Sequence, residues 1–385
     1  MVATRWSREA LRRRWRRRLS ISSKVTTDPR IITLVGICTA VAAGIVFDPP
    51  VPASGWKAAG SPAPAFKGVA KVVGPSLEAF KGVRPPLEAF KGVRPPLEAF
   101  KGVGPSLERS IDVVLVPDDA AKLHAVFRSI GYHLERVRTG DQPVPRVFVA
   151  ALPSDMPRLG SVATRKAVFI KTVLPLILRV NEENLDQRRR LILLEERVRS
   201  DRPLSAGDSL WLERLAGRYG VRRGDLEELL LRVDAIPPSL ALAQAAEESG
   251  WGTSRFAQEG NAMFGERTRY RGTPGMVPRN RPDGRRYKVK SFSWLLDGVR
   301  SYARNLNIHP AYGEFRRTRA ALRRQAGEGA GVEGLKLAAS LVRYSQRGAD
   351  YVRALKTIMG ANDLDQFDKA RLSNDAAPRR FRTGI

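Results

Sequence analysis

The sequence predicts a mainly α-helical protein of the α+β class, with a small α/β segment and a helical domain that carries one β-hairpin. Three observations lead to this prediction. Long stretches after residue 162 space their apolar residues at intervals of three and four. Short β-branched runs lie at 111–117 and 145–153, and Pro- and Gly-rich repeats precede residue 110. With 385 residues, 43% of them apolar, the chain can bury a sizeable core.

The amino end predicts a membrane anchor. Residues 5–18, RWSREALRRRWRRR, precede the uncharged run IITLVGICTAVAAGIVF at 31–47. That run has about the minimum length for a membrane-spanning helix, and the positive-inside rule keeps the arginines of the basic segment, 1–30, in the cytoplasm. We therefore expect a single-pass anchor, with the rest of the chain outside. The alternatives are a signal peptide cleaved near residues 40–42, Ala-Val-Ala, and a buried helix of a soluble domain.

Four copies of a ten-residue unit follow. Residues 71–110 read KVVGPSLEAF KGVRPPLEAF KGVRPPLEAF KGVGPSLERS. Each unit offers few apolar groups, and its prolines favour extended conformations, so we expect a semi-stiff stalk over 48–109 that could reach roughly 190 Å. The alternative is a repeat that binds a partner through its Leu and Phe side chains.

The composition argues against several classes of function. The net charge is +28, but Arg far outnumbers Lys, as a genome-wide bias would produce, so no nucleic-acid partner is expected. Cys38 is the single cysteine, and the histidines at 124, 133 and 309 are scattered. We therefore expect no metal site, and the absence of a glycine-rich phosphate-binding motif predicts no nucleotide cofactor.

The folded part is expected to begin with the α/β segment, 110–155, in which a helix at 118–130 separates the two strands. Helices follow. The run 164–200 contains Pro175, which predicts a kink, and the next helix should end at Gly220 in a left-handed cap.

A later helix ends in two adjacent glutamates, AQAAEESGWG. It should begin at a Pro-Pro-Ser sequence, and Gly250 and Gly252 should end it, so that Glu247 and Glu248 lie in its last turn. The helix dipole disfavours ionised carboxylates there, which suits an acid that must stay protonated at neutral pH. Successive helical residues point about 100° apart, so only one of the two glutamates can face a cleft.

The stretch LAQAAEESGWGTSRFAQEGNAMFG resembles the core of the glucosaminidase family of peptidoglycan hydrolases, A-Q-A-x-x-E-S-G-W-G followed by N-x-F-G. NLNIHPAYGEFRRTRAALR at 305–323 and LVRYSQRGADYVRALKTIM at 341–359 resemble later blocks of its Bax-type branch. The resemblance covers about 145–360. It implies a lysozyme-like helical domain over 156–360 with a small β-hairpin at 267–293.

The resemblance also implies cleavage of the bond between N-acetylglucosamine and N-acetylmuramic acid, with Glu248 as the general acid. Two carboxylates usually share such a reaction, but the expected hairpin is strongly basic. Three routes remain open for the second group: Glu266 or Asp283 activates water, the acetamido group of the substrate acts as nucleophile, or Tyr312 of the HPAY sequence holds the water.

Four residues form the expected substrate-binding set, each with a structural alternative. Trp251 either stacks on a sugar or packs as a hydrophobic lid. Asn261 either contacts an acetamido group or forms a turn. Phe264 also suits a structural role, and Asp283 would lie in the hairpin turn.

We thus expect a murein hydrolase that is anchored in a bacterial inner membrane and acts on glycan strands in the periplasm, with a cell-wall or secretion machine as a further partner. The alternatives are a lytic transglycosylase on the same fold and a non-catalytic cell-wall scaffold. Tyr344 and Tyr351 are expected in the core, and residues 361–385, which end in NDAAPRRFRTGI, are expected to be disordered.

Overall fold

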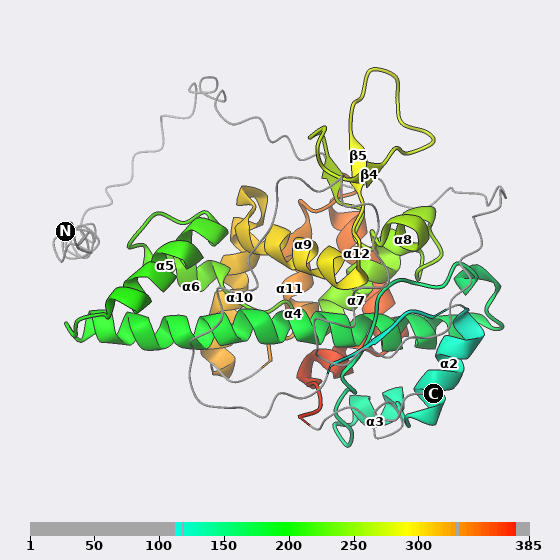
Figure 1. Cartoon of the computed structure of the whole chain (residues 1–385), viewed down its shortest axis with the longest axis horizontal. Coiled ribbons are helices and arrows are strands. Elements are labelled where there is room, and N and C mark those ends of the chain that lie inside the picture. Colours follow the sequence, from blue (N-terminus) through cyan, green and yellow to red (C-terminus); the bar gives the residue numbers. More distant parts are fainter. Residues whose placement is uncertain (1–111, 118, 328–330, 375–385) are drawn as a thin grey trace, which may run out of the picture.

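The structure is a computed structural model that describes residues 112–117, 119–327 and 331–374 (Figure 1). The expected anchor and stalk, 31–47 and 48–109, lie outside these ranges. Within them, no helix combines the length and apolar character needed to cross a membrane. The described part is mainly helical with two small sheets, as the sequence predicts.

Helix α4, Val162–Arg199, runs along the length of the helical body (Figure 1). The Ser161 hydroxyl caps it by accepting a hydrogen bond from the Thr164 amide at 3.1 Å. Residues 168–178 are buried on every side of the helix. The helical assignment continues through Pro175.

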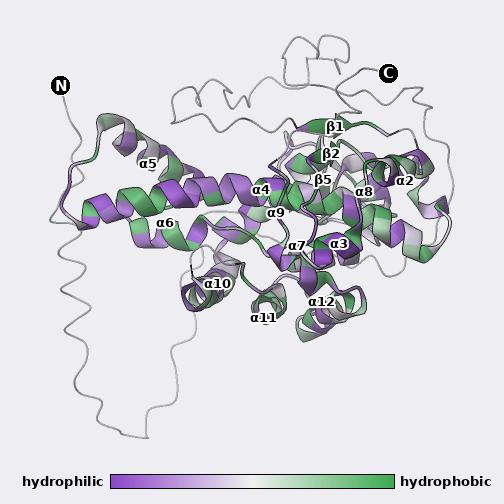
Figure 2. Ribbon diagram, turned by 90° about the horizontal axis from the view of Figure 1, so that it is seen from below, coloured by the Kyte–Doolittle hydropathy of each residue, from purple (hydrophilic) through white to green (hydrophobic). Residues whose placement is uncertain are grey.

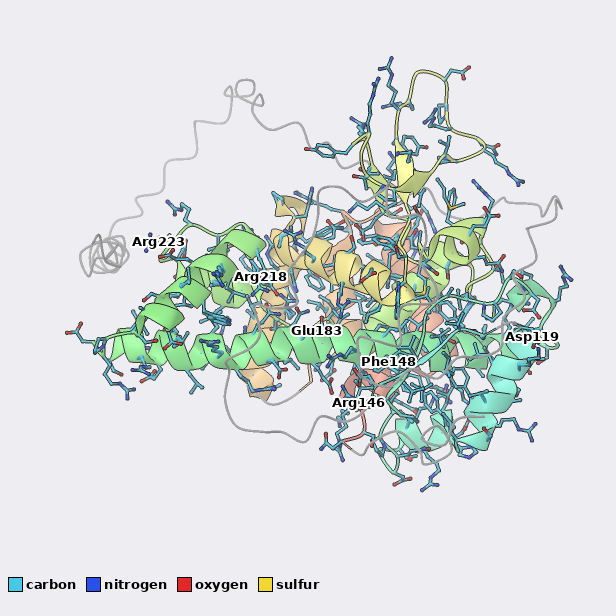
Figure 3. All side chains as sticks on the ribbon, in the orientation of Figure 1. Asp119, Arg146, Phe148, Glu183, Arg218 and Arg223 are labelled. Carbon is cyan, nitrogen blue, oxygen red and sulfur yellow. The ribbon has the colours of Figure 1, made fainter. Side chains whose placement is uncertain are left out.

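The α/β segment forms as predicted. Strands β1, Val113–Leu115, and β2, Val147–Val149, pair in parallel, and α2, Ala120–Ser129, and α3, Leu134–Arg138, lie between them. Their apolar side chains join the same core as those of α4. Arg146, labelled in Figure 3, fixes this segment, because its guanidinium contacts Asp112 at 2.7 Å and both carboxylate oxygens of Glu182 on α4 at 3.0 Å.

The remaining helices divide between the two ends of α4 (Figure 2). Beside its carboxyl-terminal half lie α5, Ala206–Tyr219, and α6, Leu226–Arg232, which form a second, smaller hydrophobic cluster. Gly220 ends α5 in the predicted left-handed cap. The other helices are α7, Pro238–Ser249, α8, Arg255–Gly260, α9, Leu295–Ile308, α10, Gly313–Ala326, α11, Gly334–Leu337, and α12, Ala349–Ala361, with short 3-10 turns η4, Met156–Arg158, η5, Pro310–Tyr312, η6, Ala338–Leu341, and η7, Leu364–Lys369.

The predicted hairpin is a three-stranded antiparallel sheet. Its strands are β3, Arg267–Thr268, β4, Gly275–Met276, and β5, Lys288–Lys290, in the order β3-β5-β4. The loop between β4 and β5 projects from the body (Figure 1). The turn expected in it is present, because the Arg285 amide donates to the Pro282 carbonyl and Gly284 has a φ of 75°.

The expectation of disorder from residue 361 onward is wrong for residues 361–374. Leu364 and Phe367 of η7 are fully buried. Asp368 accepts hydrogen bonds from the Ser239 amide at 2.9 Å and the Gly334 amide at 2.7 Å, so one carboxylate caps both α7 and α11. Two apolar residues three apart were too weak a signal for this docked segment. Residues 375–385 lie outside the described ranges.

Candidate active site

Helix α7 carries the two glutamates and lies in the middle of the helical body (Figure 1). Residues 238–246 are all buried, and its alanines let α4, α12 and η7 pack closely around it. Pro238 occupies the first turn, where its missing amide hydrogen costs nothing. Gly250 ends the helix in the left-handed conformation, with a φ of 59°. The predicted boundaries are thus confirmed, and Glu247 and Glu248 lie in the last turn.

The chain reverses tightly after α7. Trp251 and Gly252 also have positive φ angles, 57° and 78°. The Ser249 hydroxyl accepts a hydrogen bond from the Gly252 amide at 2.9 Å. A side chain at position 252 would begin only 3.0 Å from Leu152 and Phe169. This reversal leaves no room for helix continuation, and the carboxyl groups stand at a fixed helix end.

The two glutamates have different neighbours. Glu247 forms an ion pair with Arg347, with Oε1 and Nη1 2.5 Å apart. Glu248 is half-buried. Burial raises the pKa of Glu248 to about 8, the nearby Tyr351 hydroxyl on α12 opposes this rise, and the negative charge of Glu247 adds to it. One glutamate is therefore neutralised by an arginine, and the other holds a proton at neutral pH.

Aromatic side chains form a buried wall near Glu248, with Tyr312, Tyr344 and Tyr351 close enough to feel its charge. The rings of Tyr344 and Tyr351 stack with their centroids 5.4 Å apart, and Tyr312 tilts against Tyr344 at 5.9 Å. Phe264 stacks on Tyr302 at 3.8 Å. All five are buried. This aromatic wall offers a carboxylate little solvation, which is the physical cause of the raised pKa.

Glu266 is a buried carboxylate that lies near Tyr312. It is 5% exposed, and its Oε2 accepts hydrogen bonds from the Lys290 ammonium at 2.7 Å and the Ser301 hydroxyl at 3.0 Å. Its Oε1 is buried without a hydrogen-bond partner among the described residues. Burial raises the pKa of Tyr312 well above its usual value, and the charges of Glu266 and Glu248 raise it further. Tyr312 therefore lies near both carboxylates.

The other expected site residues are placed differently. Trp251 packs its ring edge-on against Phe169 at 5.6 Å, and the Lys166 ammonium lies 4.8 Å from the ring centroid. The amide nitrogen of Asn261 donates to the Phe292 and Ser293 carbonyls. These contacts are structural.

Phe264 and Asp283 are the two remaining members of the expected substrate-binding set. Phe264 has 2% of its surface exposed, and it contributes to the aromatic wall through its stacking on Tyr302. Asp283 is exposed in the projecting loop between β4 and β5. Their roles in binding substrate stay predictions.

The residues that sequence reasoning missed are Gln244 and the arginines near the acid. Gln244 lies one helical turn before Glu248 and is fully buried, and Arg347 and Arg267 oppose the raised pKa of Glu248. Tyr351 is buried as predicted, and it also lies near enough to Glu248 for each group to influence the pKa of the other. A polar residue four positions before Glu248 in an otherwise apolar helix was the one local signal.

Across the described ranges, no three His, Cys, Asp or Glu side chains are grouped closely enough to hold a metal ion.

Comparison with known proteins agrees with the sequence motifs. A family model described as mannosyl-glycoprotein endo-beta-N-acetylglucosaminidase matches residues 226–364. The chain is 34% identical to Protein bax of Escherichia coli (strain K12) over 211 residues, which is 52% of this chain and 71% of that protein. The catalytic domain of the autolysin Auto from Listeria monocytogenes aligns with 61% of this chain and 98% of its own length at 18% identity, with a TM-score of 0.30. On the family match and the Bax relative, the chain belongs to the glucosaminidase family, in its Bax-type branch.

Proposed function

We propose that this chain is a peptidoglycan hydrolase that cleaves the β-1,4 bond between N-acetylglucosamine and N-acetylmuramic acid, with Glu248 as the general acid. The observation that carries the proposal is the raised pKa of Glu248, about 8, at a half-buried position. A general acid must be protonated before it meets the substrate and must still reach solvent. Glu248 satisfies both conditions, whereas Glu247 is held by Arg347.

In the proposed reaction Glu248 gives its proton to the glycosidic oxygen as the bond to the sugar carbon breaks. The sugar then carries positive charge, as an oxocarbenium-like transition state does. Glu266 is the proposed second carboxylate and takes a proton from the attacking water through its Oε1, which has no hydrogen-bond partner among the described residues, while Lys290 and Ser301 hold its Oε2. Tyr312, near both carboxylates, positions that water.

Charge on the β-sheet lobe supports an acidic glycan as substrate. Residues 267–290 contain seven arginines and two lysines against Asp283 as the one exposed acid. Arg271, Arg279, Arg285 and Arg286 are exposed, and no ion pair to them occurs in the part of the chain that the structure describes. Arg267 lies near enough to Glu248 to lower its pKa. The muramyl and peptide carboxylates of peptidoglycan complement this charge.

The test is the product released from purified sacculi by the full-length chain, with Glu248→Gln and Glu247→Gln as a matched pair of variants one residue apart. Mass spectrometry should find reducing N-acetylglucosamine ends with the wild type and with Glu247→Gln, and none with Glu248→Gln. Anhydro-muramyl ends would instead assign a lytic transglycosylase. Binding to sacculi without release would assign a scaffold.

We further propose that residues 31–47 hold the chain in the inner membrane, with the catalytic domain in the periplasm. The support is the sequence alone: an apolar run preceded by dense arginines. Membrane fractionation of the full chain and of a variant without residues 31–47 tests the anchor. Recovery of both in the soluble fraction would contradict it.

A further inference from the structure

Basic and polar side chains gather where α2 packs beside the amino-terminal part of α4 (Figure 1). They are His124 and Arg128 of α2, Lys171 of α4, and Tyr132, which follows α2. The Lys171 ammonium lies 5.6 Å from the centroid of the Tyr132 ring. His124 and Arg128 are four positions apart and therefore share one face of α2. We call these four residues the α2–α4 cluster.

Three polar groups of the α2–α4 cluster have no partner. Lys171 is 8% exposed, and no hydrogen bond or ion pair reaches its ammonium group from the described residues. Tyr132 is 1% exposed, and its hydroxyl and Nδ1 of His124 are buried atoms without a hydrogen-bond partner among the same residues. Buried polar groups are nearly always hydrogen-bonded, so three exceptions in one place call for an explanation.

The charge of the α2–α4 cluster is also unbalanced. Burial lowers the pKa of His124, and the positive charges of Lys171 and Arg128 lower it further. Burial lowers the pKa of Lys171 as well, and the negative charge of Glu135 opposes this effect. Glu135 is 80% exposed, however, and its carboxylate lies 3.7 Å from the guanidinium of Arg138. Its charge is therefore screened by solvent and shared with another cation.

The unpartnered groups all lack an acceptor. An ammonium group only donates, a tyrosine hydroxyl donates, and Nδ1 of an imidazole donates when it carries the proton. A small oxyanion provides several acceptor oxygens and a negative charge together, and its hydrogen bonds to charged donors are the strong kind. Solvent reaches the cluster from the α2 side, because His124 is half-buried and Arg128 is exposed.

We propose that the α2–α4 cluster binds a small oxyanion, a phosphate or carboxylate group, whose oxygens accept hydrogen bonds from Lys171, Tyr132 and His124. Arg128 adds positive charge at the exposed edge of the site. The proposal is independent of the proposed function, because it assigns these residues no part in the chemistry of Glu248 and Glu266.

The structural alternative is that the Tyr132 ring alone holds the Lys171 ammonium, through a cation–π contact. The two accounts differ in their response to anions. A purely structural contact predicts that His124 does not sense phosphate or acetate beyond the effect of ionic strength. The anion site predicts a saturable change at His124 that depends on Lys171.

The experiment is an NMR titration of the full-length chain with labelled histidines. The chain has three histidines, and the imidazole signal of His124 is assigned by its absence in His124→Gln. Inorganic phosphate or acetate is added at an ionic strength held constant with sodium chloride. The His124 signal should move to saturation, while that of His309, which lies beside η5, should stay in place. Tighter binding of phosphate would assign a phosphate group, and tighter binding of acetate a carboxylate.

Lys171→Met should raise the Kd of the better anion at least about tenfold, because a hydrogen bond to a charged group is lost. Tyr132→Phe should raise it about three- to tenfold. Lys166→Met is the matched control, because it removes the same charge from α4, but from a lysine that contacts Asn362 at 2.9 Å and the Trp251 ring at 4.8 Å. Its Kd should stay within about twofold of the wild type.

Two results would overturn the anion site. One is a His124 signal in the wild type that does not saturate with either anion. The other is a Kd in Lys171→Met equal to that of the wild type. If Lys171→Met does not fold, Tyr132→Phe, which changes a single hydroxyl, gives the same decision. The titration needs no substrate, so a failure to hydrolyse peptidoglycan would count against the proposed function alone.

Discussion

Asp234 and Glu248 are both enclosed by the helical body, but their neighbours differ. Asp234, in the segment between α6 and α7, is 2% exposed and contacts Arg323 at 2.6 and 2.8 Å, Arg319 at 3.6 Å and Arg188 at 3.8 Å. Glu248 faces tyrosines and has a pKa of about 8. The comparison shows that the neighbours of a buried carboxylate decide whether it stabilises the fold or can act as an acid.

The surroundings of Asp234 are those of a structural junction. Arg319, which is fully buried, and Arg188 also donate to backbone carbonyls at the end of α6, including Leu230 and Leu231. These carbonyls end the helix and would otherwise lack donors. The junction joins α4, α6 and α10, and its carboxylate is balanced by fixed positive charge.

The largest effect expected from this comparison is on stability. Asp234→Asn should lower the free energy of unfolding by about 3–5 kcal/mol, because it leaves buried guanidinium groups without a counter-charge. Glu248→Gln should leave the free energy of unfolding at neutral pH within about 1 kcal/mol of the wild type. Urea unfolding of both variants measures this. Equal losses of unfolding free energy in the two variants would contradict the assignment of Asp234 to a structural role and Glu248 to a chemical one.

The next effect is on the rate. Glu266→Gln should lower kcat by roughly 10²- to 10³-fold, since a positioned general base contributes about that much. Asp283→Asn, a change to the other expected carboxylate, should alter kcat less than about twofold. Hydrolysis of soluble glycan strands measures both. Full activity in a folded Glu266→Gln variant would instead favour the acetamido group of the substrate as nucleophile.

A third effect is the pH dependence of stability. The folded protein holds the Glu248 proton up to about pH 8, while the ordinary carboxyl value is 4.5. The native state thus binds more protons than the unfolded state between these values, and stability falls as pH rises through that window. The unfolding free energy of the wild type relative to Glu248→Gln should drop by about 1–3 kcal/mol between pH 5 and pH 8. Asp368, whose pKa burial raises to about 6, is present in both proteins and cancels. A flat difference would contradict the raised pKa.

The smallest effect concerns the arginines of the β-sheet lobe, residues 267–290. Replacing Arg285 and Arg286 by Gln should raise KM for soluble anionic glycan strands by about 3- to 10-fold at low salt and leave kcat unchanged. The loss should shrink as salt rises. The matched control is the same change at Arg214 and Arg218, which are exposed on α5. Figure 1 shows α5 at a distance from this lobe. An equal rise of KM in the control would show a nonspecific effect of net charge.

Local features of the fold were predictable from sequence, and distant pairings were not. Helix start and stop signals act within a few residues. Examples are Gly220, Gly250 and the Pro-Pro-Ser start of α7. Glu248 and Tyr351 influence each other's pKa from positions 103 apart, as their numbers show. Asp234 gave no local sign of its arginines on α10, because apolar periodicity places a helix face but not a charge partner.

The site divides in the same way. The AQAAEESGWG sequence identified Glu248, and the helix dipole gave the direction of its pKa shift. Burial is the main cause of that shift, and the aromatic wall is assembled from α9, η5, α12 and the loop before β3. The ion pair of Glu266 with Lys290 depends on the register of β5 and could not be read from the basic composition of the hairpin.

The most direct test of the account is the pH profile of kcat/KM on soluble glycan strands for the wild type and Glu248→Gln. The account predicts a wild-type rate that falls above about pH 8, where Glu248 loses its proton. It also predicts a residual rate in Glu248→Gln that is at least about 100-fold lower and lacks this fall. A wild-type rate that already falls near pH 5, or a variant that keeps the wild-type rate and profile, would contradict the assignment of Glu248 as the acid.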